Sequence, residues 1–244
     1  MSSATGPRGR KALPVLDDEL SARMSCGGPL REPSSAAALN SCARLSALPL
    51  WTTSATRIPI NDAIILSRSD DPDFRRAWRK RVVDNDGDSA QEDGIERWIR
   101  LAEATSLDRK RVMCCHEVLP AVRYAVDAYL DLVKSRTFLE AVASSLTELF
   151  SRDLIALRMD CLRLHYPWLS SGLDYFTARL HQAPEDARFA LQWVTEHAHT
   201  RAEQELAIAA LRAKCDILWA QLDAIHFAYV QPGWPPPGAF RMES

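Results

Sequence analysis

The chain has 244 residues, of which 47% are hydrophobic and 25% are charged, and its formal net charge at pH 7 is −2. A chain of this length and composition is expected to bury one core as a soluble globular domain. The nearly balanced charge excludes bulk attraction to nucleic acid or a membrane, and no apolar run is long enough to span a bilayer. No apolar segment follows the basic residues near the N-terminus, so we predict no secretion signal and a cytoplasmic protein.

Residues 1–56 differ from the rest of the chain, because they are rich in Ser, Ala, Pro, Leu and Arg without a sustained helical or strand period. This composition predicts an irregular or disordered segment. A second hypothesis is that these residues come from a wrong reading frame or a mis-assigned start. Residues 57–240 are expected to form the folded helical domain.

The first helix-start signals follow Asp70. Asp71 is a candidate N-cap with Pro72 at the first helical position, and Asp93 with Glu96 has the spacing of a capping box. The polar stretch between these two signals is expected to be a loop. These patterns predict one helix on each side of that loop.

A longer helix is predicted from Pro120, where apolar residues recur at helical spacing. Its apolar stripe consists of Val122, Ala125, Val126, Tyr129 and Val133. Thr137 with Glu140 forms another capping box, which opens a predicted helix that runs through Phe150.

Pro184 separates two further apolar helical patterns, so separate helices are predicted before and after it. Thr200 with Glu203 opens the last long helix. No segment alternates as a strand would. We therefore predict an all-α protein folded as a compact multi-helix bundle.

Metal-ligand spacings are lacking. The six cysteines form no CxxC pair, which favours reduced thiols over a disulfide framework. His197 and His199 are two residues apart and would point to different sides of a helix. We predict no metal site.

Several polar residues share a predicted helix face with apolar ones. Lys214 lies three residues after Leu211 and four before Leu218, so it needs an anion, a neutral state or a path to the surface along its own stem. Tyr175 and Arg179 are four apart and share one face. The alternative for this pair is a half-exposed arginine that covers its own helix.

Other polar residues have equally ordinary alternatives. Tyr129 lies on its apolar stripe, where a core tyrosine with a satisfied hydroxyl is common. Glu148 could pair with Arg152 at i+4. Arg81 and Arg158 could equally be solvated. Together, the polar residues of this and the preceding paragraph would form a pocket with several cations and two phenols. Such a pocket would suit a small polycarboxylate.

Six stretches, in order, resemble the pyrroloquinoline quinone (PQQ) synthase family, from about Arg57 to about Tyr229. They are IPINDA, DNDGDSAQEDGIERWIRLAE, VLPAVRYAVDAYL, AVASSLTELF, HYPW and KCDILWAQLDAIHFAY. The resemblance implies a fold similar to haem oxygenase and a homodimer. It also implies ring closure and O2-dependent oxidation of a polycarboxylate precursor, with release of hydrogen peroxide and without a metal or organic cofactor.

The resemblance also implies site residues. Those that match the family pocket are Asp62, Arg81, Tyr129, Thr147, Glu148, Arg158, Tyr175, Arg179 and Lys214. By the same resemblance, Arg81, Arg158 and Lys214 bind substrate carboxylates or quinone oxygens. Tyr175 and Arg179 flank the oxygen position and are the expected catalytic residues.

Three family histidines are missing. Asn85 replaces one in the family motif DHDG, Ile155 replaces another, and an N-terminal Tyr-His motif has no counterpart. The Arg and Gln expected before IPxxDA are also lacking. Asn takes no proton near neutral pH, and Ile neither donates nor accepts one. Two functions therefore remain open: a PQQ synthase, or a degenerate family member that binds precursor or PQQ without turnover.

Overall fold

The computed structural model describes residues 60–88, 92–229, 234 and 236. All of them belong to one of the chain's two compact units, Ser35–Ser244. The predicted irregular segment, residues 1–56, lies outside the described residues and stays a prediction. No described helix is long and apolar enough to cross a membrane.

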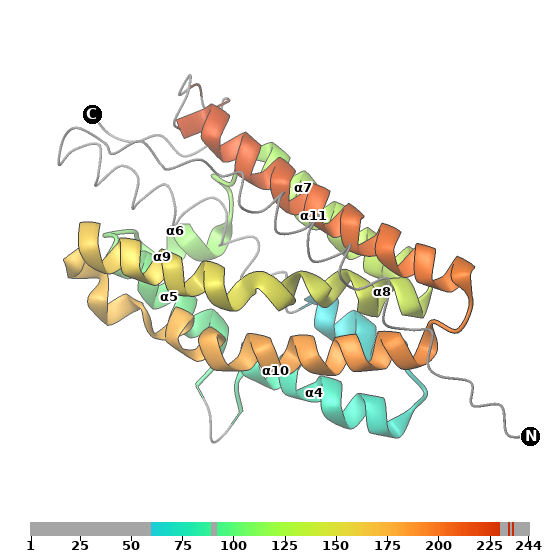
Figure 1. Ribbon diagram of the computed structural model, residues 1–244. Coiled ribbons are helices and arrows are strands. Elements are labelled where there is room, and N and C mark those ends of the chain that lie inside the picture. The colour runs from blue at the N-terminus through green and yellow to red at the C-terminus, as the bar shows by residue number, and fades with distance from the viewer. Residues whose placement is uncertain (1–59, 89–91, 230–233, 235, 237–244) are drawn as a thin grey trace, which may run out of the picture. The chain divides into compact units, whose positions relative to one another are not determined.

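Every regular element in the described part of the chain is helical, which confirms the predicted fold class (Figure 1). A helical segment at residues 60–67 comes first. The labelled α-helices are α4 (Pro72–Asp86), α5 (Gly94–Ala104), α6 (Arg109–Cys114), α7 (Pro120–Ser135), α8 (Phe138–Ser144), α9 (Ser151–His165), α10 (Asp174–His197) and α11 (Arg201–Tyr229). Two 3-10 helices, η1 (Ser145–Phe150) and η2 (Pro167–Gly172), connect α8 to α9 and α9 to α10.

The predicted helix starts are confirmed. Asp71, Asp93 and Thr137 each accept a backbone hydrogen bond at the start of α4, α5 and α8. Thr200 and Glu203 form a reciprocal pair just before α11, in which each side chain accepts from the other's backbone N–H. These local bonds satisfy N–H groups that have no partner within the helix.

The predicted helix through Phe150 is wrong in its second half. The α-helix ends at Ser144 and continues as the 3-10 helix η1. The hydroxyls of Ser144 and Ser145 donate to the carbonyls of Ala141 and Val142, three residues back. Such local bonds compete with the α-helical ladder and accompany the tighter winding.

The predicted division at Pro184 is also wrong, because α10 runs unbroken through it. Buried Ala183 and Ala187 lie on either side of the proline. Tertiary packing of this face offsets the hydrogen bond that proline cannot donate. Both halves of α10 therefore belong to one helix.

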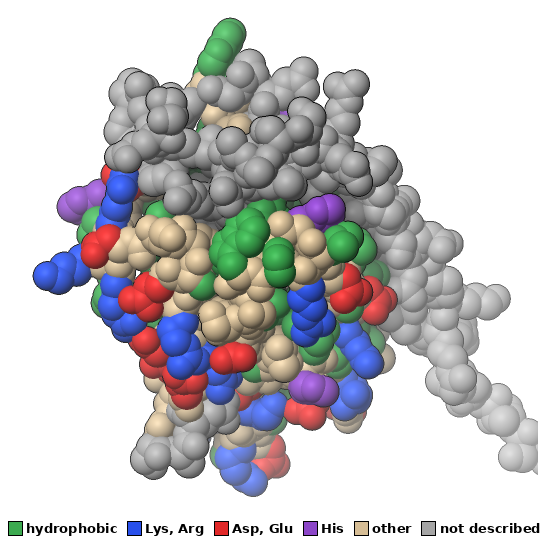
Figure 2. Space-filling view, turned by 90° about the vertical axis from the view of Figure 1, so that its left-hand side faces the viewer, with side chains coloured by type: hydrophobic (Ala, Val, Ile, Leu, Met, Phe, Trp, Pro, Cys, Tyr) green, Lys and Arg blue, Asp and Glu red, His purple; other side chains and the backbone are tan. Residues whose placement is uncertain are grey.

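The helices pack in a few main pairs, which Figure 1 shows. α11 packs against α7 and α8, α10 packs against α9 and η1, and α4 contacts both α5 and α10. On the face shown in Figure 2, Lys and Arg side chains are interspersed with Asp and Glu, as the balanced net charge predicts.

An aromatic core fixes α4 against α8 and α10. The Phe74 ring stacks on Trp78, with centroids 5.2 Å apart, and meets Phe138 edge-on at 5.1 Å. From α10, Trp193 meets Phe74 at 5.4 Å and Phe189 lies at 5.6 Å. This packing holds the next turn of α4, which carries Arg81, close to α10.

Candidate functional site

Arg81 on α4 is buried among carboxylates, with 4% of its surface exposed. Its Nη2 lies 3.0 Å from Glu148 Oε2, its Nη1 lies 3.7 Å from Asp62 Oδ1, and its Nε lies 3.8 Å from Asp186 Oδ1. The guanidinium carbon also lies 4.1 Å from the centroid of the Trp78 ring. The solvated alternative for Arg81 is therefore wrong.

Arg179 on α10 shares two of these acids. Its Nη2 donates to Glu148 Oε1 at 2.9 Å, and its Nη1 donates to Asp186 Oδ2 at 3.3 Å. We call Asp62, Arg81, Glu148, Arg179 and Asp186 the charge cluster. Glu148 thus bridges two guanidinium groups from different helices instead of pairing with Arg152, its predicted i+4 alternative.

Two acids of the charge cluster have raised pKa values. Burial raises the pKa of Asp62 to about 7, with Arg81 opposing the shift and Glu148 adding to it. Burial likewise raises the pKa of Asp186 to about 6, again with Arg81 opposing. Near neutral pH the charge cluster can therefore take up or release protons.

Lys214 on α11 is buried, with 7% of its surface exposed, so the surface-reaching alternative is wrong. Its Nζ lies 3.1 Å from the centroid of the Tyr129 ring, a cation–π arrangement. Burial lowers the pKa of Lys214 to about 7, while the nearby carboxylates Glu148 and Asp62 oppose the shift. Lys214 is thus another group that can exchange a proton near neutrality.

Tyr129 on α7 presents its hydroxyl to polar neighbours. That oxygen accepts a hydrogen bond from Asn61 Nδ2 at 3.2 Å, and Ser144 Oγ lies 3.5 Å from it. Burial raises the pKa of the phenol, so it stays protonated. Thr147 is half-buried on η1, and within the described part of the chain no hydrogen bond ties its side chain to the charge cluster.

Tyr175 and Arg158 lie in a different environment. The Tyr175 ring meets Trp98 edge-on at 4.7 Å and Phe176 at 5.5 Å, and burial raises the pKa of its hydroxyl. Arg158 lies 5.9 Å from the Phe176 ring, and burial lowers the pKa of its guanidinium. Arg158 is half-buried rather than fully solvated.

We call Trp98, Ile155, Met159, Tyr175 and Phe176 the aromatic region, because Ile155 and Tyr175 pack against the apolar core that the other three help to form. One of the missing family histidines would lie at Ile155, within this region. Asn85, at another such position, donates its Nδ2 to the backbone carbonyl of Arg81 in its own helix, at 2.9 Å.

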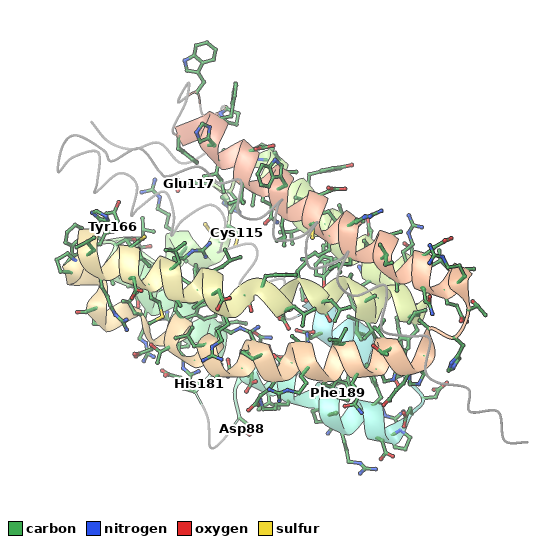
Figure 3. The ribbon with its side chains drawn as sticks, in the orientation of Figure 1. Asp88, Cys115, Glu117, Tyr166, His181 and Phe189 are labelled. Atoms are coloured by element: carbon green, nitrogen blue, oxygen red, sulfur yellow. The ribbon has the colours of Figure 1, made fainter. Side chains whose placement is uncertain are left out.

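None of the six histidines of the chain is buried, and all lie in the described residues. His165 is half-exposed and the others are exposed; His181 lies on α10 (Figure 3). No histidine therefore takes the place of the missing ones in the charge cluster or the aromatic region. Among the described residues, no group of three or more His, Cys, Asp or Glu side chains could hold a metal ion.

Asp186 belongs to the charge cluster although the sequence did not predict it. It lies seven residues after Arg179, about two turns along the same helix face. That spacing was a usable signal. The helix boundary predicted at Pro184 hid it, because it assigned the two residues to different helices.

The family model described as the TENA/THI-4/PQQC family matches residues 55–224. A relative from Acidiphilium cryptum named pyrroloquinoline-quinone synthase is 54% identical over 184 residues, which cover 75% of this chain and 75% of its own. Proteins of the same name from Xanthomonas oryzae and Rhizobium meliloti are each 51% identical, covering 75% and 76% of this chain and 74% and 73% of their own.

Among solved structures, a domain of unknown function from Shewanella denitrificans has a haem oxygenase-like fold and matches with a TM-score of 0.66. The match covers 94% of this chain and 97% of that one, at 11% identity. At this identity the likeness concerns the fold alone, and it agrees with the predicted haem oxygenase-like bundle.

Proposed function

The chain belongs to the TENA/THI-4/PQQC family, and from this premise we propose that it acts in PQQ biosynthesis as the synthase of the last step. That reaction closes a ring and oxidises a polycarboxylate precursor with O2. Each O2 that leaves as hydrogen peroxide takes two electrons and two protons from the precursor. The site must therefore bind a polyanion, move protons and stabilise reduced oxygen.

The observation that carries this proposal is the gathering of buried Arg81 and Lys214 with half-buried Arg179, in a chain 54% identical to a named synthase. Lys214 and both arginines are within electrostatic range of Glu148. Guanidinium groups bind carboxylates through paired hydrogen bonds, so this cluster suits a polycarboxylate.

The proposed roles follow the chemistry of each group. Arg81, Arg158 and Lys214 hold carboxylates or quinone oxygens of the ligand. Tyr175 and Arg179 flank the oxygen molecule. The reaction needs no metal or organic cofactor, and the protein acts as a homodimer in the cytoplasm.

In this proposal, proton transfer is carried out by the titratable groups that are still present in the site. Lys214 and Asp62 both exchange protons near neutral pH, because burial brings their pKa values to about 7. They are the groups available to take over from the missing histidines.

A second candidate function is binding of precursor or PQQ without turnover. It is supported by Asn85, which is hydrogen-bonded to its own helix, and by Ile155, which is packed in an apolar cluster. Loss of one positioned acid or base typically lowers a rate by about 10²–10⁴-fold.

The deciding experiment is an aerobic absorbance assay of the purified protein with the ring-open precursor. Quinone formed at a rate that scales with enzyme concentration supports the synthase. A bound-precursor spectrum without product supports binding alone, and an unchanged spectrum contradicts both functions.

A further inference from the structure

The guanidinium of Arg81 is surrounded by the protein's own acids, through ion pairs rather than hydrogen bonds, and its Nη2 has no hydrogen-bond partner among the described residues. Each of its three nitrogens faces a different carboxylate, from Asp62, Glu148 and Asp186. Both terminal nitrogens of Arg179 are engaged as well. A ligand carboxylate that pairs with Arg81 must therefore take a position next to these acids.

The charge cluster already holds three carboxylates against two guanidinium groups. A ligand carboxylate would add another negative charge at a buried position, and like charges there disfavour ionisation of one another. The charged and titratable groups around Asp62 are Arg81, Tyr129, Glu148, Arg179, Asp186 and Lys214. Neutralising one acid removes this conflict.

We infer that a polyanion binding at this site brings a proton with it from solvent, and that Asp62 is the carboxylate that receives it. The inference rests on the proposed function only for the class of ligand, a polycarboxylate. The step moves one proton from solvent to a carboxylate oxygen, and no other bond changes.

Asp62 is the least firmly held of the three acids. Its ion pair with Arg81 is long, at 3.7 Å, and its Oδ1 has no hydrogen-bond partner among the described residues. Glu148 and Asp186, by contrast, each accept a hydrogen bond from Arg179 in addition to their ion pair with Arg81, although Glu148 Oε2 also has no hydrogen-bond partner among the described residues. Protonation of Asp62 therefore gives up one long ion pair, whereas protonation of either other acid would also weaken a hydrogen bond.

Protonation would also make the site complementary to the ligand. A neutral Asp62 has an O–H that can donate to a ligand oxygen, and it releases Nη1 of Arg81 to do the same. The raised pKa of Asp62, about 7, agrees with this, because the proton then binds near neutral pH.

Isothermal titration calorimetry of the full chain with PQQ tests the inference. Titrations at pH 8 in buffers of different ionisation enthalpy give the number of protons taken up on binding. Lys214 can gain a proton too, so the diagnostic quantity is a difference. We expect Asp62→Asn to take up about one proton fewer than the wild type while still binding PQQ.

Asp73→Asn is the matched control, because Asp73 is an exposed carboxylate on α4 that pairs with Arg76. It should take up as many protons as the wild type. Equal uptake in the wild type and Asp62→Asn overturns the inference.

Lys214→Met keeps the test valid if Asp62→Asn does not fold. Without the lysine, about one proton should still be taken up, and the affinity should fall about tenfold per pH unit above the pKa of Asp62. Binding without proton uptake overturns the inference, and absence of PQQ binding by the wild-type protein overturns it together with the ligand class. If PQQ binding takes up a proton but the aerobic assay shows no product, only the proposed synthase activity is contradicted.

Discussion

The charge cluster and the aromatic region meet on α10, where Arg179 belongs to one and Tyr175 to the other. In the charge cluster, buried acids and guanidinium groups compensate one another. In the aromatic region, the phenol of Tyr175 lies among apolar side chains, with Trp98 in an edge-on contact and Ile155 in the same core. One region is dense in charge and the other is poor in groups that exchange protons.

This difference separates two requirements of the proposed reaction. The charge cluster contains Arg81, which is proposed to bind a polyanion, and four of its five members, all but Asp186, are predicted site residues. The missing histidine at Ile155 would have lain in the aromatic region, where oxygen is proposed to bind. A substitution at Ile155, which is not part of the charge cluster, should therefore change oxygen chemistry more than ligand binding.

The largest effect is expected from Arg81→Ala. It leaves buried Asp62 and Asp186 and half-buried Glu148 with one guanidinium fewer, and breaking a buried ion pair by removing one partner costs about 3–5 kcal/mol. Urea denaturation should show a loss of this size in the free energy of unfolding. Arg76→Ala, whose ion pair with Asp73 is exposed, should change it by less than about 1 kcal/mol. Equal losses would contradict the compensation described for the charge cluster.

The next largest effect is expected in the pH dependence of stability, which Lys214 should dominate above pH 7. Its pKa of about 7 lies below the ordinary value of 10.5, so between these pH values the unfolded chain binds a proton that the folded chain does not. Wild-type stability should therefore rise with pH across this window. Lys214→Met should remove that slope and stabilise the protein at pH 7 by a few kcal/mol, at about 1.4 kcal/mol per pKa unit.

Thermal unfolding of Lys214→Met at several pH values measures this slope. Lys134→Met, at an exposed position on α7, is the control and should keep the wild-type dependence. A slope that survives in Lys214→Met would mean that another group causes it.

A gain of function is expected from Ile155→His. It adds a proton-transfer group to the aromatic region, and such groups typically contribute about 10²-fold or more to a rate. The aerobic assay should show faster quinone formation from the precursor, while PQQ affinity, which is proposed to depend on the charge cluster, stays close to that of the wild type. Ile155→Val should give no gain. An unchanged rate in Ile155→His would show that proton transfer there does not limit turnover.

The smallest effect is expected from Lys80→Ala, at the edge of the charge cluster. Lys80 pairs with Glu185 at 2.8 Å, next to Asp186, but about half of its side chain is exposed. Exposed ion pairs contribute about 0–1 kcal/mol, so Lys80→Ala should leave both the unfolding midpoint in urea and PQQ affinity nearly unchanged. A large loss of affinity would extend the charge cluster to the surface.

Local sequence signals predicted the helix starts, because a helix cap depends only on residues that are neighbours in the sequence. The caps at Asp71, Thr137 and Thr200 are short-range hydrogen bonds that the sequence displays directly. The break predicted at Pro184 failed because long-range packing decides whether a helix continues. For the same reason, the local pairing of Glu148 with Arg152 lost to partners on α4 and α10.

The site residues were predicted from the family resemblance rather than from the spacing of residues along the sequence. Arg81 and Glu148 are 67 positions apart in the sequence, and no helical period connects them. Asp186 could have been found at i+7 from Arg179, had α10 been predicted as a single helix. Which acid faces which nitrogen depends on the packing of whole helices, and the sequence does not display it.

The proline inside α10 also bears on how rigidly the second guanidinium is held. Pro184 has no N–H to offer the carbonyl of Leu180, so one rung of the helical ladder is missing between Arg179 and Asp186. A small flexure at that rung would change the distance between these two side chains without unfolding either half of the helix. The length of the hydrogen bond from Arg179 to Asp186 thus depends on the curvature of α10. A small change in that curvature would alter the affinity for the proposed polyanion.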